Sequence, residues 1–587
     1  MFSYIVGCFA RSRGARPRSV TLPGPGGRAC PAAVAAVVTA GSVAMPEARA
    51  DGAWFTDVAQ QAGLTHSQVG DLPPMASPIA EMGGGAAVGD YNGNGLLDLY
   101  FPREHGPDIL YANQGDGTFL DVTEQAFGAQ VPTNSTNGAL FADLNNNGRL
   151  ELFVNAGTSD RHYVFVNDGA GAFEDRSTEH GLGYHHVEHE MMGHGAAAGD
   201  YTGNGYLDLY LPDWSGRSSE QPPRNRLLRN SGPAAPGHFQ DVTEQAGLDT
   251  PNNQFGFAGR FADLNRNGHV DLVTTNDFGH SQLYWNQGDG TFVEGTADAG
   301  YGTGTNDMGL AVADYNNNGW LDVFTTSIGT EGIEVNPTRA GNRLYENQMR
   351  HEVPGLYFSD RTDTAGVRWG HWGWGASFID YNNNGLRDLV MVNGWPFDEY
   401  PYNNTPMRFW ENQGDGTFIE KSVELGLTDD GDGRGVVVAD FNNNGWLDIL
   451  VIRHNDTPLL YENQGGDNDW LRIDTVGTLS NRQGIGAWIT VVPDLDAEEL
   501  FYVHEMNLGN NYAGHNETTA HFGLGELDGT VDYVHIRWPS GMEQELFDVS
   551  PNQVLTVTEI PEPGSAAIIG TATLLLMMRR RRNGGSR

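Results

Sequence analysis

Residues 313–324 read ADYNNNGWLDVF, and this stretch decides the fold because six other stretches repeat its pattern. The other copies begin at Gly89, Ala142, Gly199, Ala262, Ile379 and Ala439. Counted from Asp314, oxygen-bearing side chains occupy positions 1, 3, 5 and 9, and glycine occupies position 6. Seven copies of one short loop indicate a repeat protein.

The spacing is typical of a calcium-binding loop. Calcium takes six to eight oxygen ligands in a flexible cage, and glycine permits the sharp turn. The backbone carbonyl at position 7 would complete each set. We therefore predict six or seven structural Ca²⁺ ions, one per loop. Of the seven loops, the one with Glu151 is the weakest candidate for an ion, because an extra methylene alters its position 9.

The predicted ligands, loop by loop, are Asp90, Asn92, Asn94, Leu96, Asp98; Asp143, Asn145, Asn147, Arg149, Glu151; Asp200, Thr202, Asn204, Tyr206, Asp208; Asp263, Asn265, Asn267, His269, Asp271; Asp314, Asn316, Asn318, Trp320, Asp322; Asp380, Asn382, Asn384, Leu386, Asp388; and Asp440, Asn442, Asn444, Trp446, Asp448.

Two other interpretations of the loops compete with this one. An EF-hand needs a bidentate glutamate at position 12, and the seven copies carry other residues there, for example Phe101 and Met391. Metal-free Asx-turn hairpins would explain a single copy. Seven copies with matched spacing favour calcium.

Composition and the N-terminal segment indicate an exported protein. Between the two arginine-rich ends, residues 51–560 carry 23 basic and 73 acidic residues, a formal net charge of −50. A nucleic-acid partner is excluded, because a phosphate backbone needs a cationic face. Residues 1–50 combine arginines, an apolar run and an A-x-A site at 48–50, as a signal peptide does. Both cysteines, Cys8 and Cys30, lie within this segment, so we expect no disulfide in the mature chain.

The C-terminal end carries a second candidate sorting signal. Pro561-Glu562-Pro563 precedes an apolar run, residues 566–578, and the arginines 579–582. Thirteen residues are short for a spanning helix of about 20. The order of these parts resembles a PEP-CTERM sorting signal of bacteria. The resemblance implies that residues 560–587 act as a transient membrane anchor, removed on transfer to the cell surface or outside. An ordinary tail anchor is the alternative.

The repeat unit predicts the architecture. Each loop lies in a unit of roughly 50–66 residues with four short strand-like runs separated by Gly, Asn and Asp turns. An extra copy of the closing run, beginning at Phe55, stands before the first loop, and the seventh unit lacks one. The N-terminal strand can thus complete the last unit and remove free sheet edges. We predict an all-β fold, a seven-bladed β-propeller with a small C-terminal β domain.

The loops resemble FG-GAP/VCBS repeats, the calcium-bearing units of integrin-α-type propellers. The segments Gly484-Ile485-Gly486-Ala487 and Trp538-Pro539-Ser540-Gly541 resemble those of the ASPIC/UnbV domain. Together, residues 52–559 resemble the cartilage-acidic-protein family and its bacterial relatives, which implies a secreted calcium-binding protein. We place the propeller at 51–465 and the ASPIC/UnbV-like domain at 466–559. The acidic stretch 491–507 lacks the Gly-rich hairpin expected there, which suggests a diminished domain.

Two clusters are candidate ligand sites. The first holds His185, His186, His189, Glu190 and His194, whose H-E-x-x-x-H spacing is one residue too long for a zinc-protease helix. It fits either a transition-metal site or a polar loop at the channel mouth. The second holds aromatic residues and a histidine that fit either a sugar platform or packing between blades: Trp214, His371, Trp372 and Trp395.

No catalytic constellation stands out in the sequence. We therefore predict a calcium-binding surface or matrix protein, located at the cell surface or outside the cell, that binds an extracellular protein or polysaccharide. The alternative is a polysaccharide-active hydrolase or lyase that uses the propeller face opposite the calcium loops. Two carboxylates beside tryptophan in a pocket of that face would favour the enzyme.

Overall fold

The structure is a computed structural model that describes residues 54–67, 82–133, 135–157, 161–182, 193–214, 224–250, 253–302, 305–332, 339–349, 357–395, 402, 404–454, 456–497, 500–509 and 511–561. The predicted signal peptide, nearly all of the predicted sorting tail, and His185, His186, His189 and Glu190 lie outside these residues. Within them, no helix is both long and apolar enough to cross a membrane.

Between residues 55 and 463, the described strands form seven antiparallel sheets, each built mainly from one repeat. Their strands are, sheet by sheet, β2 (Ala87–Gly89), β3 (Asp98–Phe101), β4 (Ile109–Asn113), β5 (Phe119–Asp121); β6 (Thr136–Ala142), β7 (Glu151–Ala156), β8 (Tyr163–Asn167), β9 (Phe173–Asp175); β10 (Ala197–Gly199), β11 (Asp208–Leu211), β12 (Arg226–Asn230), β13 (Phe239–Asp241); β14 (Gly256–Ala262), β15 (Asp271–Asn276), β16 (Leu283–Asn286), β17 (Phe292–Glu294); β18 (Leu310–Ala313), β19 (Asp322–Thr325), β21 (Arg343–Asn347), β22 (Phe358–Asp360); β20 (Ile328–Gly329), β23 (His371–Ile379), β24 (Asp388–Asn393), β25 (Arg408–Asn412), β26 (Phe418–Glu420); and β27 (Gly433–Ala439), β28 (Asp448–Arg453), β29 (Leu459–Asn463), β1 (Phe55–Asp57).

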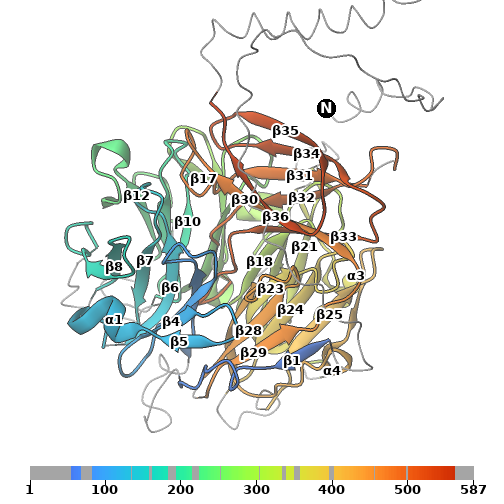
Figure 1. Cartoon of the computed structure of the whole chain (residues 1–587), viewed down its shortest axis with the longest axis horizontal. Helices are drawn as coiled ribbons and strands as arrows, with labels where there is room; N and C mark the ends of the chain where they lie inside the picture. The colour runs from blue at the N-terminus through green and yellow to red at the C-terminus, as the bar shows by residue number, and fades with distance from the viewer. Residues whose placement is uncertain are drawn as a thin grey trace, which may run out of the picture. The chain divides into compact units, whose positions relative to one another are not determined.

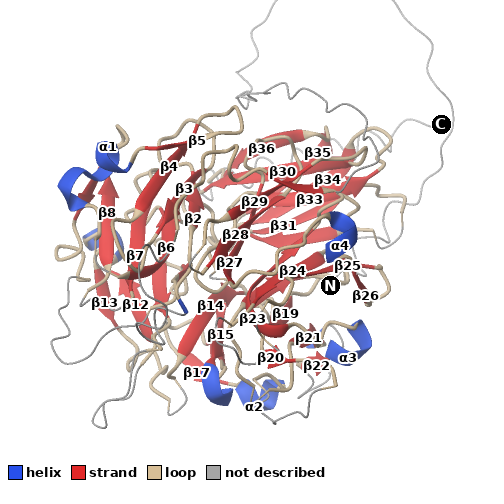
Figure 2. Ribbon diagram, turned by 90° about the horizontal axis from the view of Figure 1, so that it is seen from below, coloured by secondary structure: helices blue, strands red, loops and turns tan. Residues whose placement is uncertain are grey.

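Short helices accompany the outer strands of four sheets (Figure 2). They are α1 (Thr123–Phe127), α2 (Thr296–Ala299), α3 (Thr362–Ala365) and α4 (Ser422–Leu425), with 3-10 turns η4 (Gly128–Gln130), η5 (Gly232–Ala234) and η6 (Asp277–Gly279).

The N-terminal strand closes the last sheet, which confirms the expectation from the sequence. Strand β1 pairs with β29, and Phe55 lies opposite Asn463. In Figure 1 the blue β1 lies beside the orange β29. The first and last sheets also share one buried cluster that includes Val88, Leu99, Val437 and Leu450. The predicted all-β propeller class is therefore confirmed.

One asparagine at the end of the third strand joins each sheet to its predecessor. Asn412, for example, donates through Nδ2 to the carbonyl of Tyr315 in the preceding repeated loop (2.7 Å) and to that of Arg387 in its own (2.9 Å). Equivalent bonds to the preceding loop come from Asn113, Asn167, Asn230, Asn286, Asn347 and Asn463. The Asn113 bond reaches Phe441 in the seventh loop and so closes the circle.

The innermost strands approach closely because they are rich in Gly and Ala. A Cβ on Gly309 would lie 2.1 Å from the Trp374 carbonyl oxygen, and one on Gly138 would lie 2.5 Å from the Gly195 Cα. Side chains at these positions would force neighbouring sheets apart. The Gly/Ala bias that the sequence shows is thus a requirement of packing near the centre of the ring.

The C-terminal domain has two sheets, ordered β33-β30-β36 and β32-β31-β34-β35. Residues such as Leu471, Ile489 and Trp538 form its core. The sequence suggested a diminished domain, because residues 491–507 lack a Gly-rich hairpin. The structure nevertheless has a hairpin here, in which Thr490 pairs with Val503. The strands are β30 (Asp469–Val476), β31 (Trp488–Val492), β32 (Tyr502–Glu505), β33 (Ala520–Gly525), β34 (Val531–Arg537), β35 (Glu543–Val549) and β36 (Gln553–Thr558).

The connection between β32 and β33 enters the middle of the ring. Ala198 of β10 forms a β-bridge with Leu508, and the Leu310 N–H donates to the Asn511 carbonyl (3.1 Å). The Tyr512 hydroxyl donates to the Met82 carbonyl (2.7 Å), and Tyr512 is fully buried. We call residues 508–509 and 511–516 the central segment. It joins the two domains through the propeller's innermost strands.

Candidate calcium loops and an aromatic face

The seven repeated loops join the first and second strands of their sheets and therefore lie at one face of the propeller, the loop face. We number them 1 to 7 in chain order, from 90–98 to 440–448. In loop 1 the Asp90 carboxylate accepts the backbone N–H groups of Gly93, Asn94 and Gly95 at 2.7–3.0 Å. The Leu96 N–H donates to Asn94 Oδ1 (2.8 Å). These bonds curl the loop around the predicted ligands.

The carboxylate at position 9 is buried in every loop. In six loops it accepts the backbone N–H of the third-strand asparagine, as Asp98 does from Asn113 (2.9 Å). Burial, with a smaller contribution from the charge of Asp90, raises the pKa of Asp98 to about 7. Burial likewise raises the pKa of Asp208 and Asp388 well above the usual range. A cation between positions 1 and 9 would favour the ionised forms.

The donor set fits calcium. Asp208 Oδ2 is fully buried and has no hydrogen-bond donor among the described residues, which leaves it available to a cation, whereas the equivalent oxygens of Asp98 and Asp448 accept backbone N–H groups (3.3 and 3.1 Å). No site in the described chain gathers three or more His, Cys, Asp or Glu side chains. The loops would therefore use two carboxylates with amide and backbone oxygens, the hard ligands that calcium prefers.

Loop 2 departs from the others at Glu151. The longer side chain accepts the backbone N–H groups of Leu144 (2.9 Å) and Asn145 (3.2 Å) and the Asn145 amide (2.6 Å). Its oxygens therefore turn toward the loop. Burial and then the charge of Asp143 raise the pKa of Glu151 to about 8. Whether loop 2 binds its ion more weakly than the other loops stays a prediction.

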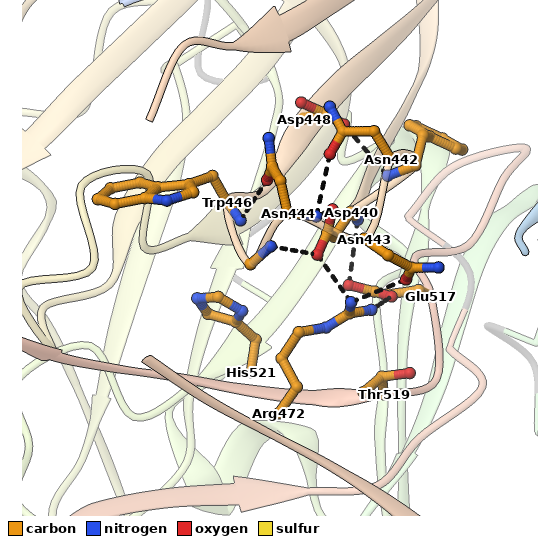
Figure 3. Close-up of polar contacts among 12 residues, drawn as sticks. Asp440, Asn442, Asn443, Asn444, Trp446, Asp448, Arg472, Glu517, Thr519 and His521 are labelled. Carbon is orange, nitrogen blue, oxygen red and sulfur yellow. Dashed lines mark hydrogen bonds and ion pairs between the residues drawn. The ribbon is translucent and has the colours of Figure 1, made fainter. Parts of the chain in front are cut away.

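The C-terminal domain covers part of the loop face. Arg472 lies between the position-1 carboxylate of loop 7, Asp440 (2.7 Å), and Glu517 (Figure 3). Arg537 contacts the equivalent carboxylate of loop 4, Asp263 (2.7 Å). The two loop carboxylates thus bind both their own loops and the second domain.

Of the other predicted ligand residues, Trp214, His371, Trp372 and Trp395 lie at the opposite face, at the ends of the strands away from the loops. A continuous run of ring contacts, 4.3–6.3 Å between centroids, crosses this face in the order Phe278, Trp214, Phe257, Trp374, Trp395, Trp372 and Tyr402. Trp374, Phe257 and Trp395 are buried, whereas Phe278 is 46% exposed and Trp214 and Trp372 are half-buried. We call Trp214, Phe255, Phe278, Trp372, Trp395 and Tyr402 the aromatic face.

Three residues of this region have left-handed backbones: Phe255 (φ 56°), Phe278 (φ 58°) and His371 (φ 63°). Bulky residues adopt this conformation at an energetic cost, and such strain gathers at ligand sites. His371 Nε2 accepts from the Arg408 guanidinium (2.8 Å). Burial and then the charge of Arg408 lower the pKa of His371 to about 4.

His194 lies beneath the aromatic face. It is fully buried, its Nδ1 accepts from the Asn137 amide (2.7 Å), and its ring lies 5.4 Å from that of Tyr512 in the central segment. Burial lowers the pKa of His194 to about 3. His194 therefore packs inside the propeller, and the other members of the histidine cluster lie outside the described residues, so a metal site there stays a prediction.

Sequence reasoning missed three sets of residues. The third-strand asparagines were visible as the first letter of the recurring NQGDG turn, and the middle Asn of the NNN loops was visible as a repeat. Tyr512 had no signal, because the sequence NLGNNYAGHN around it has neither helical nor strand periodicity.

Known family models match both the repeat region and the C-terminal domain. The FG-GAP-like repeat matches residues 90–154, 143–211, 263–325 and 380–451, and "ASPIC and UnbV" matches 477–563. The chain thus contains segments similar to FG-GAP-like repeats, followed by a segment similar to the ASPIC and UnbV domain.

Cartilage acidic protein 1 of Mus musculus is 23% identical over 525 residues, which cover 84% of this chain and 76% of that one. The Homo sapiens protein is 22% identical over 522 residues, which cover 84% and 74%. Among solved structures, YCF48 bound to D1 peptide matches 73% of this chain and 99% of that chain, with 8% identity and a TM-score of 0.39.

Proposed function

We propose that this chain is an exported, calcium-stabilised propeller that binds an extracellular protein or polysaccharide through its aromatic face. The observation that carries the proposal is the run of ring contacts from Phe278 to Tyr402, in which Phe278 is exposed and Trp214 and Trp372 are half-buried, while the terminal Tyr402 is buried. Aromatic rings with buried support offer a rigid surface at little cost in side-chain entropy.

Calcium is proposed as the structural ion of the loop face. The buried position-9 carboxylates and the donor-free Asp208 Oδ2 support this assignment. When bound, the ion would supply charge compensation and hold each turn closed. The role of the chain's own residues is to orient oxygens: the backbone N–H groups of each loop fix the position-1 carboxylate, and the third-strand asparagine fixes position 9.

The proposed location is the cell surface or the space outside. The arginine-flanked segment 1–50, the tail 560–587 and the net charge of −50 between them support export, transient membrane anchorage through the tail and no nucleic-acid partner. The similarity to cartilage acidic protein 1 supports the same location.

A binding screen tests the proposal. The purified chain is applied to a glycan array and to immobilised extracellular proteins, with calcium and with chelator. Trp372→Ala and Trp214→Ala should lower retention at least tenfold, whereas Trp285→Ala, which changes a half-buried tryptophan of the third strand β16, should not. Equal retention of all three variants, or no retention by the parent chain on either surface, would reject the aromatic face as the site.

The enzymatic alternative has one observation in its favour. Asp277 accepts the Trp214 indole N–H (3.1 Å), and burial raises the pKa of Asp277 to about 6, with Asp307 adding to the rise. A carboxyl group with such a pKa beside tryptophan suits a general acid. Release of shortened polysaccharide that Asp277→Asn abolishes, with binding retained, would establish this alternative.

A further inference from the structure

The residue at position 4 of every loop has a left-handed backbone, with φ between 54° and 75°. Asn and Gly adopt this conformation at little cost, which explains the middle Asn of the NNN loops. In five loops this residue has a polar side chain with an N–H donor, asparagine in four loops and arginine in loop 4, and each such side chain reaches the next loop around the ring. In each case it donates to the carbonyl of the glycine at position 6.

Asn317 of loop 5 illustrates the contact, because its Nδ2 donates to the Gly385 carbonyl of loop 6 (3.0 Å). The other four bonds, at 3.0–3.1 Å, are Asn146 to Gly205, Arg266 to Gly319, Asn383 to Gly445 and Asn443 to Gly95. Arg266 replaces asparagine in loop 4 and also lies over the rings of Trp320 and Trp488.

The series has two breaks. Loops 1 and 3 carry Gly93 and Gly203 at position 4, which have no side chain to donate. The bonds therefore connect loops 4, 5, 6, 7 and 1 in one run, and loops 2 and 3 in a separate pair. A Cβ at Gly93 or Gly203 would meet nothing within 4 Å, so space does not forbid a side chain at either position.

Each inter-loop bond ends on the peptide group that orients two predicted ligands. In loop 6 the Gly385 carbonyl accepts from Asn317, and the N–H of the same peptide unit, that of Leu386, donates to Asn384 Oδ1 (2.8 Å). The Gly385 N–H donates to Asp380 Oδ2 (2.8 Å). Ordering loop 5 therefore helps to hold the position-5 and position-7 groups of loop 6.

We propose that the position-4 side chains couple the loops, so that calcium binds cooperatively within the run 4-5-6-7-1 and within the pair 2-3, but not across the two breaks. This inference rests on the calcium binding proposed above. An ion that orders one loop presents that loop's position-4 side chain to the next, which then loses less conformational freedom on binding its own ion.

Asn317→Gly is the first test, because glycine keeps the left-handed backbone and removes only the donor. Asn404→Gly is the matched control: Asn404 is also left-handed (φ 50°) but lies in the connection before β25. The full chain is stripped of metal and titrated with Ca²⁺ by calorimetry and native mass spectrometry. Loss of one hydrogen bond should weaken the coupled sites by roughly two- to tenfold.

Hydrogen exchange locates the effect. At half-saturating calcium, Asn317→Gly should speed exchange of the Gly385 and Leu386 amides in loop 6, while Asn404→Gly should match the parent chain. Gly203→Asn supplies the missing donor toward Gly268 of loop 4 and should raise protection of that loop. A change confined to loop 5, or parent-like behaviour of both Asn317→Gly and Gly203→Asn, would overturn the coupling.

The outcomes separate this inference from the proposed function. A parent chain that binds no calcium would remove both. A parent chain that binds six or seven ions with a statistical distribution of partly filled species, unchanged in Asn317→Gly, would keep the calcium sites and remove the coupling. Depletion of partly filled species in the parent chain and their recovery in Asn317→Gly would support both.

Discussion

At the scale of single residues, asparagine holds this propeller together. The third-strand asparagines connect neighbouring sheets, and the position-4 asparagines connect neighbouring loops. The third-strand position uses a short side chain with a donor amide, and the position-4 residue combines an N–H donor with a backbone at φ > 0. Leucine or valine at these positions would leave buried carbonyls unsatisfied, which is costly in a packed interior.

Asn412→Ala tests the inter-sheet bond. The variant loses both donors, to the Tyr315 and Arg387 carbonyls, at a buried position. Because buried carbonyls remain unpaired, we expect the free energy of unfolding to fall by about 3 kcal/mol. Gln413→Ala, the exposed neighbour, should change it by less than about 0.5 kcal/mol. Denaturant unfolding measures both, and equal effects would contradict the assignment.

His194 provides a test by pH. Its pKa is about 3 in the folded chain and 6.5 in an ordinary solvated histidine, so below pH 6.5 the unfolded chain takes up a proton that the folded chain does not. The contribution of neutral His194 is complete above pH 6.5 and is lost as pH falls toward 3. Relative to His194→Gln, the parent chain should lose about 2 kcal/mol of unfolding free energy between pH 7 and pH 5. Parallel pH profiles for the two chains, measured in saturating calcium, would show that His194 does not titrate in this way.

At the scale of elements, the sequence predicted what repeats and missed what occurs once. The four-strand unit, the loops and the pairing of Phe55 with the last sheet followed from periodic residues such as Asp314 and Gly319. The central segment is a single irregular connection, and the contacts of Tyr512 with Met82 and Trp374 join residues more than 100 positions apart. No local pattern encodes such contacts. The aromatic face was predicted in part, because Trp214 and Trp395 follow second strands.

Tyr512→Ala tests the central segment. The Tyr512 ring is buried among Trp374, Phe257 and His194, with centroids 5.1–5.7 Å apart. Truncation leaves a cavity in a closely packed region, so we expect a loss of about 3–5 kcal/mol of unfolding free energy. Tyr512→Phe keeps the ring and removes the hydroxyl's contacts with the Met82 carbonyl (2.7 Å) and His194 Nδ1 (3.3 Å), and should cost about 1 kcal/mol. A smaller cost for alanine than for phenylalanine, measured by denaturant unfolding, would contradict the packed arrangement.

At the scale of the whole molecule, the loop face and the aromatic face are opposite ends of the same strands, and the central segment reaches from one toward the other. The C-terminal domain contacts loop carboxylates through Arg472 and Arg537, while Tyr512 of the same domain contacts rings under the aromatic face. Stability of the loops and geometry of the far face are therefore expected to depend on each other. The Arg472 guanidinium also contacts two buried carboxylates, those of Asp440 and Glu517. The contact with Asp440 forms only when the C-terminal domain is docked on the loop face.

Chelation tests this dependence across the whole chain. A ligand that binds only the folded state stabilises it by about 2.7 kcal/mol per site at a hundredfold excess over the dissociation constant, so removal of six or seven ions should lower the melting temperature strongly. We also expect proteolytic cleavage near residues 508–516 to begin after chelation, because the loops that hold Arg472 and Arg537 lose their order.

Asp314→Ala should bind one ion fewer by native mass spectrometry and should have a melting temperature between those of the parent chain with and without calcium. An unchanged melting curve in excess chelator, with Mg²⁺ as the control cation, would contradict the structural role of calcium.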